Sequence, residues 1–496
     1  MSAYLPMTIK KSLAWLGLAQ AISVILQFAS SVVLARYLTP YEMGIFAVAV
    51  ATVAMLSVFQ QLGLNALIVR EEVLTEEVSS TAFTVNALLS IALSLVVVAA
   101  SYGGAAFLGD EGVRHVLLVL AVPPLLGILS FLPAANLERH GRFRDLALVT
   151  TAGGVVSAGV TIALAVLGLS YMSVAYAQLA GSGLMTALLV IVGRRHFRTR
   201  VGLTSWRRVT DFAFQMLAVS GINNASQRLS EIMLARLLGL GSLGIYNRAS
   251  GLSSLIWTNF HMAVSRVVLV DYADLNRRGV SLRERYLQTV AIVTAVLWPA
   301  FAGLAVLAEP FIVIVYGERW AAAVTPFVFL AIASMILVSI TMTWELFTST
   351  NQLRAQTRIE FKRMILSITL FVGACAISLE AAAATRIVDA LIALVMYRPH
   401  LNRMTGTRTA DFWGIYARSA LLTVFAVTPA AALMLLDVAG GPAGQAPLPF
   451  IFGAVALGIL FWGWGLFALG HPLAAELGGT VRNRLRAFRP QAALSR

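Results

Sequence analysis

Long apolar segments, separated by short polar gaps, run along the whole chain. A helix of about 20 apolar residues crosses the hydrocarbon core of a bilayer, whereas strands of a membrane barrel alternate over about 10 residues. The pattern therefore predicts an all-α membrane protein. It places fourteen transmembrane helices at residues 12–36, 41–63, 81–107, 114–137, 145–168, 171–193, 209–236, 243–268, 286–308, 322–348, 362–380, 383–398, 413–437 and 448–469.

One stretch of the sequence returns 200 positions later without a gap. Residues 22–49 and 222–249 share ten identities in twenty-eight positions, among them Gly44 and Gly244. Both copies lie where one apolar segment ends and the next begins. Internal repeats are typical of membrane transporters built from two similar halves.

The repeat predicts how the chain is divided. We expect two pseudo-symmetric six-helix lobes, related as parallel repeats about an axis along the membrane normal. The predicted parts are a first lobe at 1–193, a basic cytoplasmic linker at 194–208, a second lobe at 209–404, an additional two-helix segment at 405–470 and a basic cytoplasmic tail at 471–496.

Composition and charge support this interpretation. The chain has 496 residues, of which 59% are hydrophobic and only 12% charged, too few charges to cover the surface of a soluble protein. Of the 37 basic residues, 30 fall on one side of the predicted membrane, which places both termini in the cytoplasm. The net charge of +14 is thus explained by topology and by anionic lipids, and no nucleic-acid partner is expected.

No cofactor or metal site is predicted. Cys375 is the only cysteine, and the six histidines are widely spaced without a ligand-like pair.

The two copies of the repeat share a polar stripe. Residues Gln20, Ser23, Gln27, Ser30 and Ser31 align with Ser220, Asn223, Gln227, Ser230 and Glu231, and Asn224 and Arg228 extend the second copy. Their spacing places most of each stripe on one helical face. Such residues serve either as hydrogen bonds between helices or as the lining of a polar passage.

Charged residues within the apolar segments are the strongest functional candidates, because each costs about 2.5–3.5 kcal/mol to insert. Arg228 and Glu231 stand three apart and either pair with each other or line a cationic cavity together with Arg248. Glu231 and Glu345 are candidates for proton or sodium coupling, although Glu345 also fits a position at the inner interface. Arg386 and Asp389 are expected to pair with each other.

Three stretches resemble the polysaccharide-transporter family of Wzx-type oligosaccharide-lipid flippases, within the multidrug/oligosaccharidyl-lipid/polysaccharide (MOP) superfamily. They are residues 33–44, the echo ending in Gly244-Ile245-Tyr246-Asn247-Arg248, and Leu307-Ala308-Glu309-Pro310 running to Tyr316-Gly317-Glu318-Arg319-Trp320. The resemblance implies two six-helix bundles around a central cavity that opens alternately to each face. It also implies a bacterial inner-membrane protein that moves polyprenyl-pyrophosphate-linked oligosaccharides for exopolysaccharide, capsule or lipopolysaccharide synthesis, with the polymerase machinery as a further partner.

On this hypothesis Arg228 and Arg248 attract the pyrophosphate, while five amide side chains hydrogen-bond the sugar: Gln20, Gln27, Asn223, Asn224 and Gln227. Two alternatives remain open. One is a drug/cation antiporter of the same superfamily, which generally has twelve helices and an acidic cavity. The other is a membrane glycosyltransferase, polymerase or ligase, although the outer loops predicted here are short for such an enzyme. We therefore do not expect the protein to be an enzyme.

Overall fold

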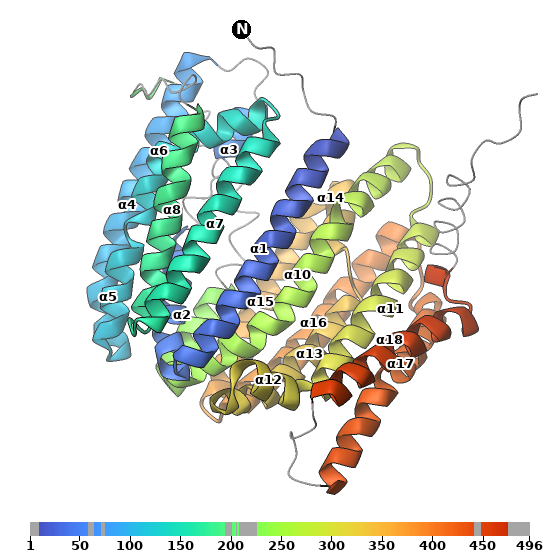
Figure 1. Ribbon diagram of the computed structural model, residues 1–496. Coiled ribbons are helices and arrows are strands. Elements are labelled where there is room, and N and C mark those ends of the chain that lie inside the picture. The colour runs from blue at the N-terminus through green and yellow to red at the C-terminus, as the bar shows by residue number, and fades with distance from the viewer. Residues whose placement is uncertain are drawn as a thin grey trace, which may run out of the picture. The chain divides into compact units, whose positions relative to one another are not determined.

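A computed structural model describes residues 9–57, 64–70, 75–193, 201–204, 206–207, 226–440 and 448–474. Within these ranges every regular element is a helix, as the apolar pattern predicts (Figure 1). The chain forms two compact units, Met1–Asn247 and Arg248–Arg496, and the boundary between them falls inside one continuous helix, α10. The lobe boundaries inferred from the repeat stay a prediction.

Antiparallel helices build the first unit. Helix α7 packs against α1 and α8, and α6 packs against α4 and α8, as Figure 1 shows. The elements are α1 (Ile9–Tyr37), α2 (Pro40–Ser57), α3 (Leu64–Arg70), α4 (Glu76–Leu108), α5 (Glu111–Leu120), α6 (Pro123–Arg139), α7 (Phe143–Val166), α8 (Met172–Gly193), a helix at 226–238 and the start of α10 (Leu240–Arg277).

Two prolines divide the apolar segment predicted at 114–137 into α5 and α6. Pro123 and Pro124 cannot donate backbone hydrogen bonds, so the helix is interrupted at Ala121 and Val122. The hydroxyl of Ser94 on α4 donates to the Ala121 carbonyl at 2.7 Å and satisfies it at the break.

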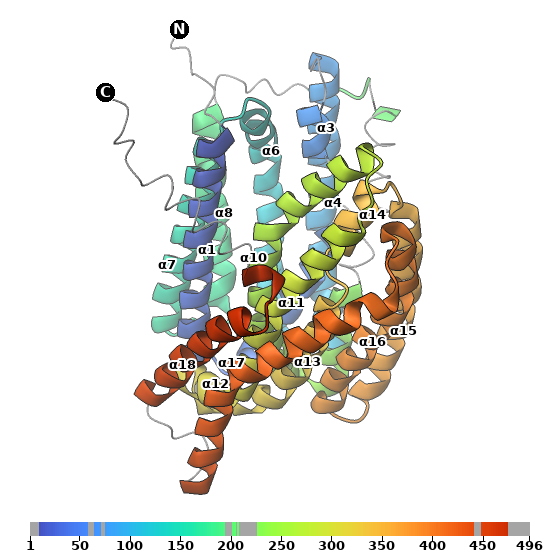
Figure 2. The ribbon, with the colours of Figure 1, turned by 90° about the vertical axis from the view of Figure 1, so that its right-hand side faces the viewer.

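The second unit continues α10 and adds the remaining helices. Figure 2 shows α17 and α18 together, and α17 packs on α11. The elements are α11 (Arg283–Val306), α12 (Ala308–Tyr316), η2 (Glu318–Ala323), α13 (Val324–Val338), α14 (Thr343–Ser349), α15 (Leu353–Cys375), α16 (Leu379–Thr405), η3 (Thr409–Phe412), α17 (Trp413–Gly440) and α18 (Leu448–Ala468).

A proline also explains how α18 is attached to this unit. Pro299 lies inside α11 and leaves the carbonyl four residues earlier, that of Ala295, without its helical donor. The indole Nε1 of Trp462 on α18 donates to that carbonyl at 2.8 Å. Thr294 and Ser419 add a buried hydroxyl pair between α11 and α17, 2.9 Å apart. The two C-terminal helices are therefore bonded to α11 by specific polar contacts within an apolar environment.

Ten helical segments in the described residues are long and apolar enough to cross a membrane. They correspond to ten of the predicted spans. Of the other four, 209–236 lies largely outside the described residues, 243–268 and 383–398 fall within α10 and α16, and 362–380 overlaps α15, which ends at Cys375. These three helices are continuous but carry more charge, so the count of fourteen stays a prediction.

The charges of α15 and α16 correct one expectation. Asp389 pairs with Arg363 of α15, at 3.1 Å, and not with Arg386 as predicted from their spacing. Arg363 also contacts Glu360 at 3.0 Å, whereas Arg386 lies over the ring of Phe371. The pairing differs because α15 brings a second arginine to Asp389, which local spacing cannot reveal.

The two copies of the repeat meet in the first unit, at the starts of α2 and α10. A Cβ atom on Gly44 would lie 1.8 Å from the carbonyl oxygen of Leu240, and one on Gly244 would lie 1.9 Å from that of Pro40. The contact is reciprocal, because Pro40 and Leu240 are equivalent positions of the repeat, as are the two glycines. Only glycine permits backbones to approach so closely. We call this contact the glycine crossing.

The glycine crossing predicts that Gly44→Ala destabilises the protein. The new methyl group meets backbone, which cannot rotate away, so overpacking should cost about 1–3 kcal/mol or more. Thermal unfolding of the purified protein in detergent measures the effect. Gly241→Ala is the matched control, because it lies on the same helix α10 and a Cβ there meets nothing within 4 Å. Equal melting temperatures for the two variants would contradict the crossing.

Candidate functional site

Helix α1 carries the first half of the predicted polar stripe. Gln20 and Gln27 are exposed on this helix, and the Ser23 hydroxyl between them donates to the Ala19 carbonyl of its own helix, at 2.9 Å. Positions 20, 23 and 27 share one helical face. The two amide groups therefore stand on the surface of α1, where they can donate and accept hydrogen bonds.

The helix at 226–238 carries the described part of the second stripe, and here the structure brings the predicted residues together. Arg228 Nη1 lies 2.8 Å and 3.1 Å from the two carboxylate oxygens of Glu231. The amide of Gln227 lies 3.5 Å from the same carboxylate. The Glu231 side chain is buried, whereas that of Arg228 is 29% exposed. Pairing is thus the observed arrangement, and it leaves one side of the guanidinium accessible. Asn223 and Asn224 lie outside the described residues.

Arg248 is held between two aromatic rings in the second unit. Its guanidinium carbon lies 4.6 Å from the ring centre of Tyr316, at the end of α12, and 4.6 Å from that of Trp320, in η2. Between these two rings the chain turns at Gly317, whose φ of 102° favours glycine. Desolvated cation–π contacts contribute about 2 kcal/mol or more.

This aromatic clamp on Arg248 was not predicted, although all three residues lie in stretches that carried the family resemblance. The available signal in the sequence was an arginine near the start of a predicted helix and two aromatic residues four positions apart. Their contact joins residues some 70 positions apart, which periodicity does not report. Arg248 is only 7% exposed, so the clamp buries most of its charge.

Glu345 forms a third polar cluster, on α14 of the second unit. Its side chain is completely buried, and its Oε1 accepts a hydrogen bond from the Ser265 hydroxyl on α10. His261 Nε2, one turn earlier on α10, lies 3.4 Å from the same oxygen, and its ring stacks on Trp257.

Two atoms of this cluster have hydrogen-bonding capacity left over. Glu345 Oε2 and His261 Nδ1 are both buried, and neither has a hydrogen-bond partner among the described residues. The cluster of Glu345, His261 and Ser265 therefore places a carboxylate oxygen and an imidazole nitrogen with unused hydrogen-bonding capacity in one buried site.

Sequence comparisons relate this chain to proteins of polysaccharide biosynthesis. A family model described as "Polysaccharide biosynthesis protein" matches residues 33–325. A membrane protein from the cps region of Klebsiella pneumoniae is 21% identical over 484 residues, 96% of this chain and 98% of its own. The lipopolysaccharide biosynthesis protein WzxC of Escherichia coli K12 is 25% identical over 318 residues, 62% of this chain and 63% of its own. The succinoglycan biosynthesis transport protein ExoT of Rhizobium meliloti is 25% identical over 331 residues, which are 66% of this chain and 67% of its own length.

Solved structures share the fold. The lipid II flippase MurJ, in a conformation described as inward closed, aligns with a TM-score of 0.71 over 93% of this chain and 99% of its own, at 15% identity. An inward-facing multidrug resistance MATE transporter of the MOP superfamily aligns with a TM-score of 0.59 over 80% of this chain and 100% of its own, at 14% identity.

The Arg228–Glu231 pair predicts a non-additive mutant cycle. Glu231→Gln leaves Arg228 without its acid and should destabilise the protein by about 1–3 kcal/mol, below the roughly 3–5 kcal/mol of a fully buried pair, because Arg228 is partly exposed. Arg228→Gln should cost more, about 3–5 kcal/mol, because it leaves the buried Glu231 carboxylate without its cation, and the double variant should recover part of the loss. Unfolding midpoints of the four proteins measure the coupling, and strictly additive effects would exclude the pair.

Proposed function

Because the chain belongs to the polysaccharide biosynthesis protein family, among the Wzx-type transporters of the MOP superfamily, we propose that it is a membrane flippase for polyprenyl-pyrophosphate-linked oligosaccharides. The observation that carries the proposal is the family match over residues 33–325, in a chain built of membrane helices. Related proteins are named for lipopolysaccharide, succinoglycan and teichuronic acid synthesis, so the repeat unit would feed an exopolysaccharide, capsule or lipopolysaccharide. The protein would act in the bacterial inner membrane, with both termini in the cytoplasm.

Transport would proceed by alternating access. On the predicted topology the glycine crossing lies at the outer ends of α2 and α10, because the loop before each helix is an outer one. A contact between backbones is well suited to a closed gate, since no side chain has to be withdrawn when the helices separate. The crossing would therefore close the outer side while substrate enters from the cytoplasm, and would open for release.

Charged and amide side chains would divide the work of recognition. Arg228, whose guanidinium is partly accessible, would contact the pyrophosphate, since arginine binds phosphate oxygens in bidentate fashion. Arg248 would add positive charge, but from within its aromatic clamp. The exposed amides of Gln20, Gln27 and Gln227, with Asn223 and Asn224, would hydrogen-bond sugar hydroxyls.

Energy would come from an ion gradient acting on Glu345. Of the two candidate carboxylates, Glu231 already accepts two hydrogen bonds from Arg228. Glu345 has a buried oxygen without a hydrogen-bond partner among the described residues and an imidazole beside it. Proton or sodium binding there would neutralise a buried charge, which favours one packing of α10 and α14 over another.

The MATE transporters share the fold, so drug/cation antiport is the second candidate function. The charge of the substrate distinguishes this function from the proposed one. A site that contains Arg228 would repel the cations that an antiporter binds. An enzyme that extends or transfers glycans is the alternative from another class, and it would change the chemistry of a lipid-linked sugar.

Transfer of radiolabelled lipid-linked oligosaccharide across vesicles containing the purified protein tests the proposal. We expect labelled lipid of unchanged glycan length in the opposite leaflet. Arg228→Ala with Arg248→Ala should lower the rate by about tenfold or more, the loss expected when a charge-assisted phosphate contact is removed. Arg277→Ala, at a side chain that is 74% exposed, is the control. Glycan elongation would indicate an enzyme, and normal transfer by the double variant would remove the charge-attraction model.

Glu345→Gln tests the coupling. The amide keeps the shape and the bond from Ser265 but cannot titrate, so transport driven by an imposed pH or sodium gradient should be lost while gradient-free exchange persists. Glu309→Gln, outside the cluster on α12, is the control. Gradient-driven transport by Glu345→Gln at the wild-type rate would exclude Glu345 as the coupling residue.

A further inference from the structure

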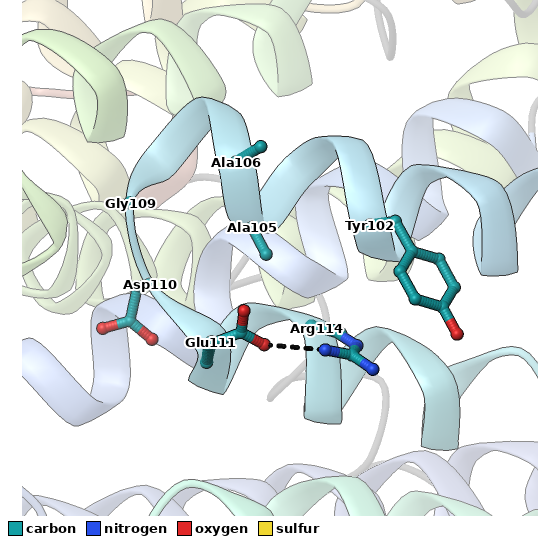
Figure 3. A pocket seen from close by; sticks show the side chains of 7 residues that line it. All are labelled: Tyr102, Ala105, Ala106, Gly109, Asp110, Glu111 and Arg114. Carbon is teal, nitrogen blue, oxygen red and sulfur yellow. Dashed lines mark hydrogen bonds and ion pairs between the residues drawn. The ribbon is translucent and has the colours of Figure 1, made fainter.

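A pocket of about 310 Å³ lies in the first unit where α4 ends and α5 begins (Figure 3). Gly109 ends α4 with a φ of 73°, and Asp110 caps α5, so the chain reverses sharply around the pocket. The lining residues are Tyr102, Ala105, Ala106, Gly109, Asp110, Glu111 and Arg114. On the predicted topology this turn is an outer one.

The pocket contains one cation and two carboxylates. Arg114 Nη1 lies 3.1 Å from Glu111, and its guanidinium carbon lies 4.7 Å from the ring centre of Tyr102. Its Nε is buried and has no hydrogen-bond partner in the described parts of the chain. Asp110 accepts from the Gly112 N–H at 2.6 Å and from the Tyr41 hydroxyl. The three ionised groups sum to one negative charge, and Arg114 retains donors that neither acid uses.

An exposed apolar stripe on α4 leads to this pocket. Leu88, Ile91 and Leu95 are 45–64% exposed, and Tyr102, which lines the pocket, is 56% exposed. These positions share one face of the helix. A ligand with an acyl chain along the stripe would therefore bring its polar end to Arg114 and Glu111.

We propose that this pocket binds the headgroup of a zwitterionic phospholipid that carries a primary ammonium, that is, phosphatidylethanolamine. The lipid phosphate accepts hydrogen bonds from the terminal guanidinium nitrogens of Arg114, whose side chain is 36% exposed. The ammonium donates to Glu111 and lies in the field of Asp110, while the acyl chains follow the stripe on α4. This binding site is independent of the proposed transport activity.

Charge and hydrogen bonding select this lipid from the common ones. Phosphatidylglycerol carries a net negative charge and no ammonium, so the net negative pocket opposes it. Phosphatidylcholine has the same charges as phosphatidylethanolamine, but its quaternary ammonium has no N–H to donate to Glu111. Glycerophosphoethanolamine has the full headgroup but no chain to lie along the stripe.

Binding of dioleoyl phosphatidylethanolamine to the delipidated full-length protein in detergent, followed by native mass spectrometry, tests the proposal. We expect tighter binding than for the dioleoyl choline and glycerol lipids, and no measurable binding of glycerophosphoethanolamine. Arg114→Gln should weaken binding by about tenfold, as for the loss of one charge-assisted hydrogen bond. Glu111→Gln, at a side chain 69% exposed, should weaken it without disturbing the fold.

Arg277→Gln is the matched control, because Arg277 also pairs with an acid three residues away, at 3.5 Å, but lines no part of this pocket. Unfolding temperatures of the lipid-free variants verify that the fold is intact. Equal affinity for all three lipids, or unchanged binding by both Arg114→Gln and Glu111→Gln, would overturn the proposal. Equal binding of glycerophosphoethanolamine would indicate a soluble ligand and would also overturn it.

Discussion

The close backbone contact at the glycine crossing is the constraint that fixes how α2 and α10 pack. Gly44 lies on the carbonyl of Leu240, and Gly244 lies on the carbonyl of Pro40. The two contacts are equivalent, because Gly44 and Pro40 correspond to Gly244 and Leu240 at an offset of 200 residues. The two copies of the repeat therefore meet through the glycine that both copies share, and any side chain at either glycine would force α2 and α10 apart.

Helix α10 connects this crossing to a second fixed point. Four residues after Gly244, Arg248 enters the clamp of Tyr316 and Trp320, and one long helix thus carries both features. The three stretches that carried the family resemblance are consequently packing devices: two form the crossing, and the third holds the arginine at the end of the second.

Local pattern was sufficient for most of the fold. Apolar length predicted the helices, and the Arg228–Glu231 pair followed from a spacing of three. The features that the sequence did not predict depend on contacts between helices. Asp389 pairs with Arg363 rather than with Arg386, the aromatic clamp joins α10 to η2, and His261 meets Glu345 across 84 positions of sequence. Periodicity orients a side chain on its own helix, but it does not determine which neighbouring helix that side chain meets.

Movement at the crossing is the most direct test of the account. Spin labels at Tyr37 and Leu237, equivalent positions of the repeat that are each about half exposed, would report it in a Cys375→Ala background. Double electron–electron resonance in nanodiscs should give two populations of the distance between the labels. Added lipid-linked oligosaccharide should shift the ratio of these populations. A single distance, unchanged by substrate in protein that still transports, would contradict a gate at the glycine crossing.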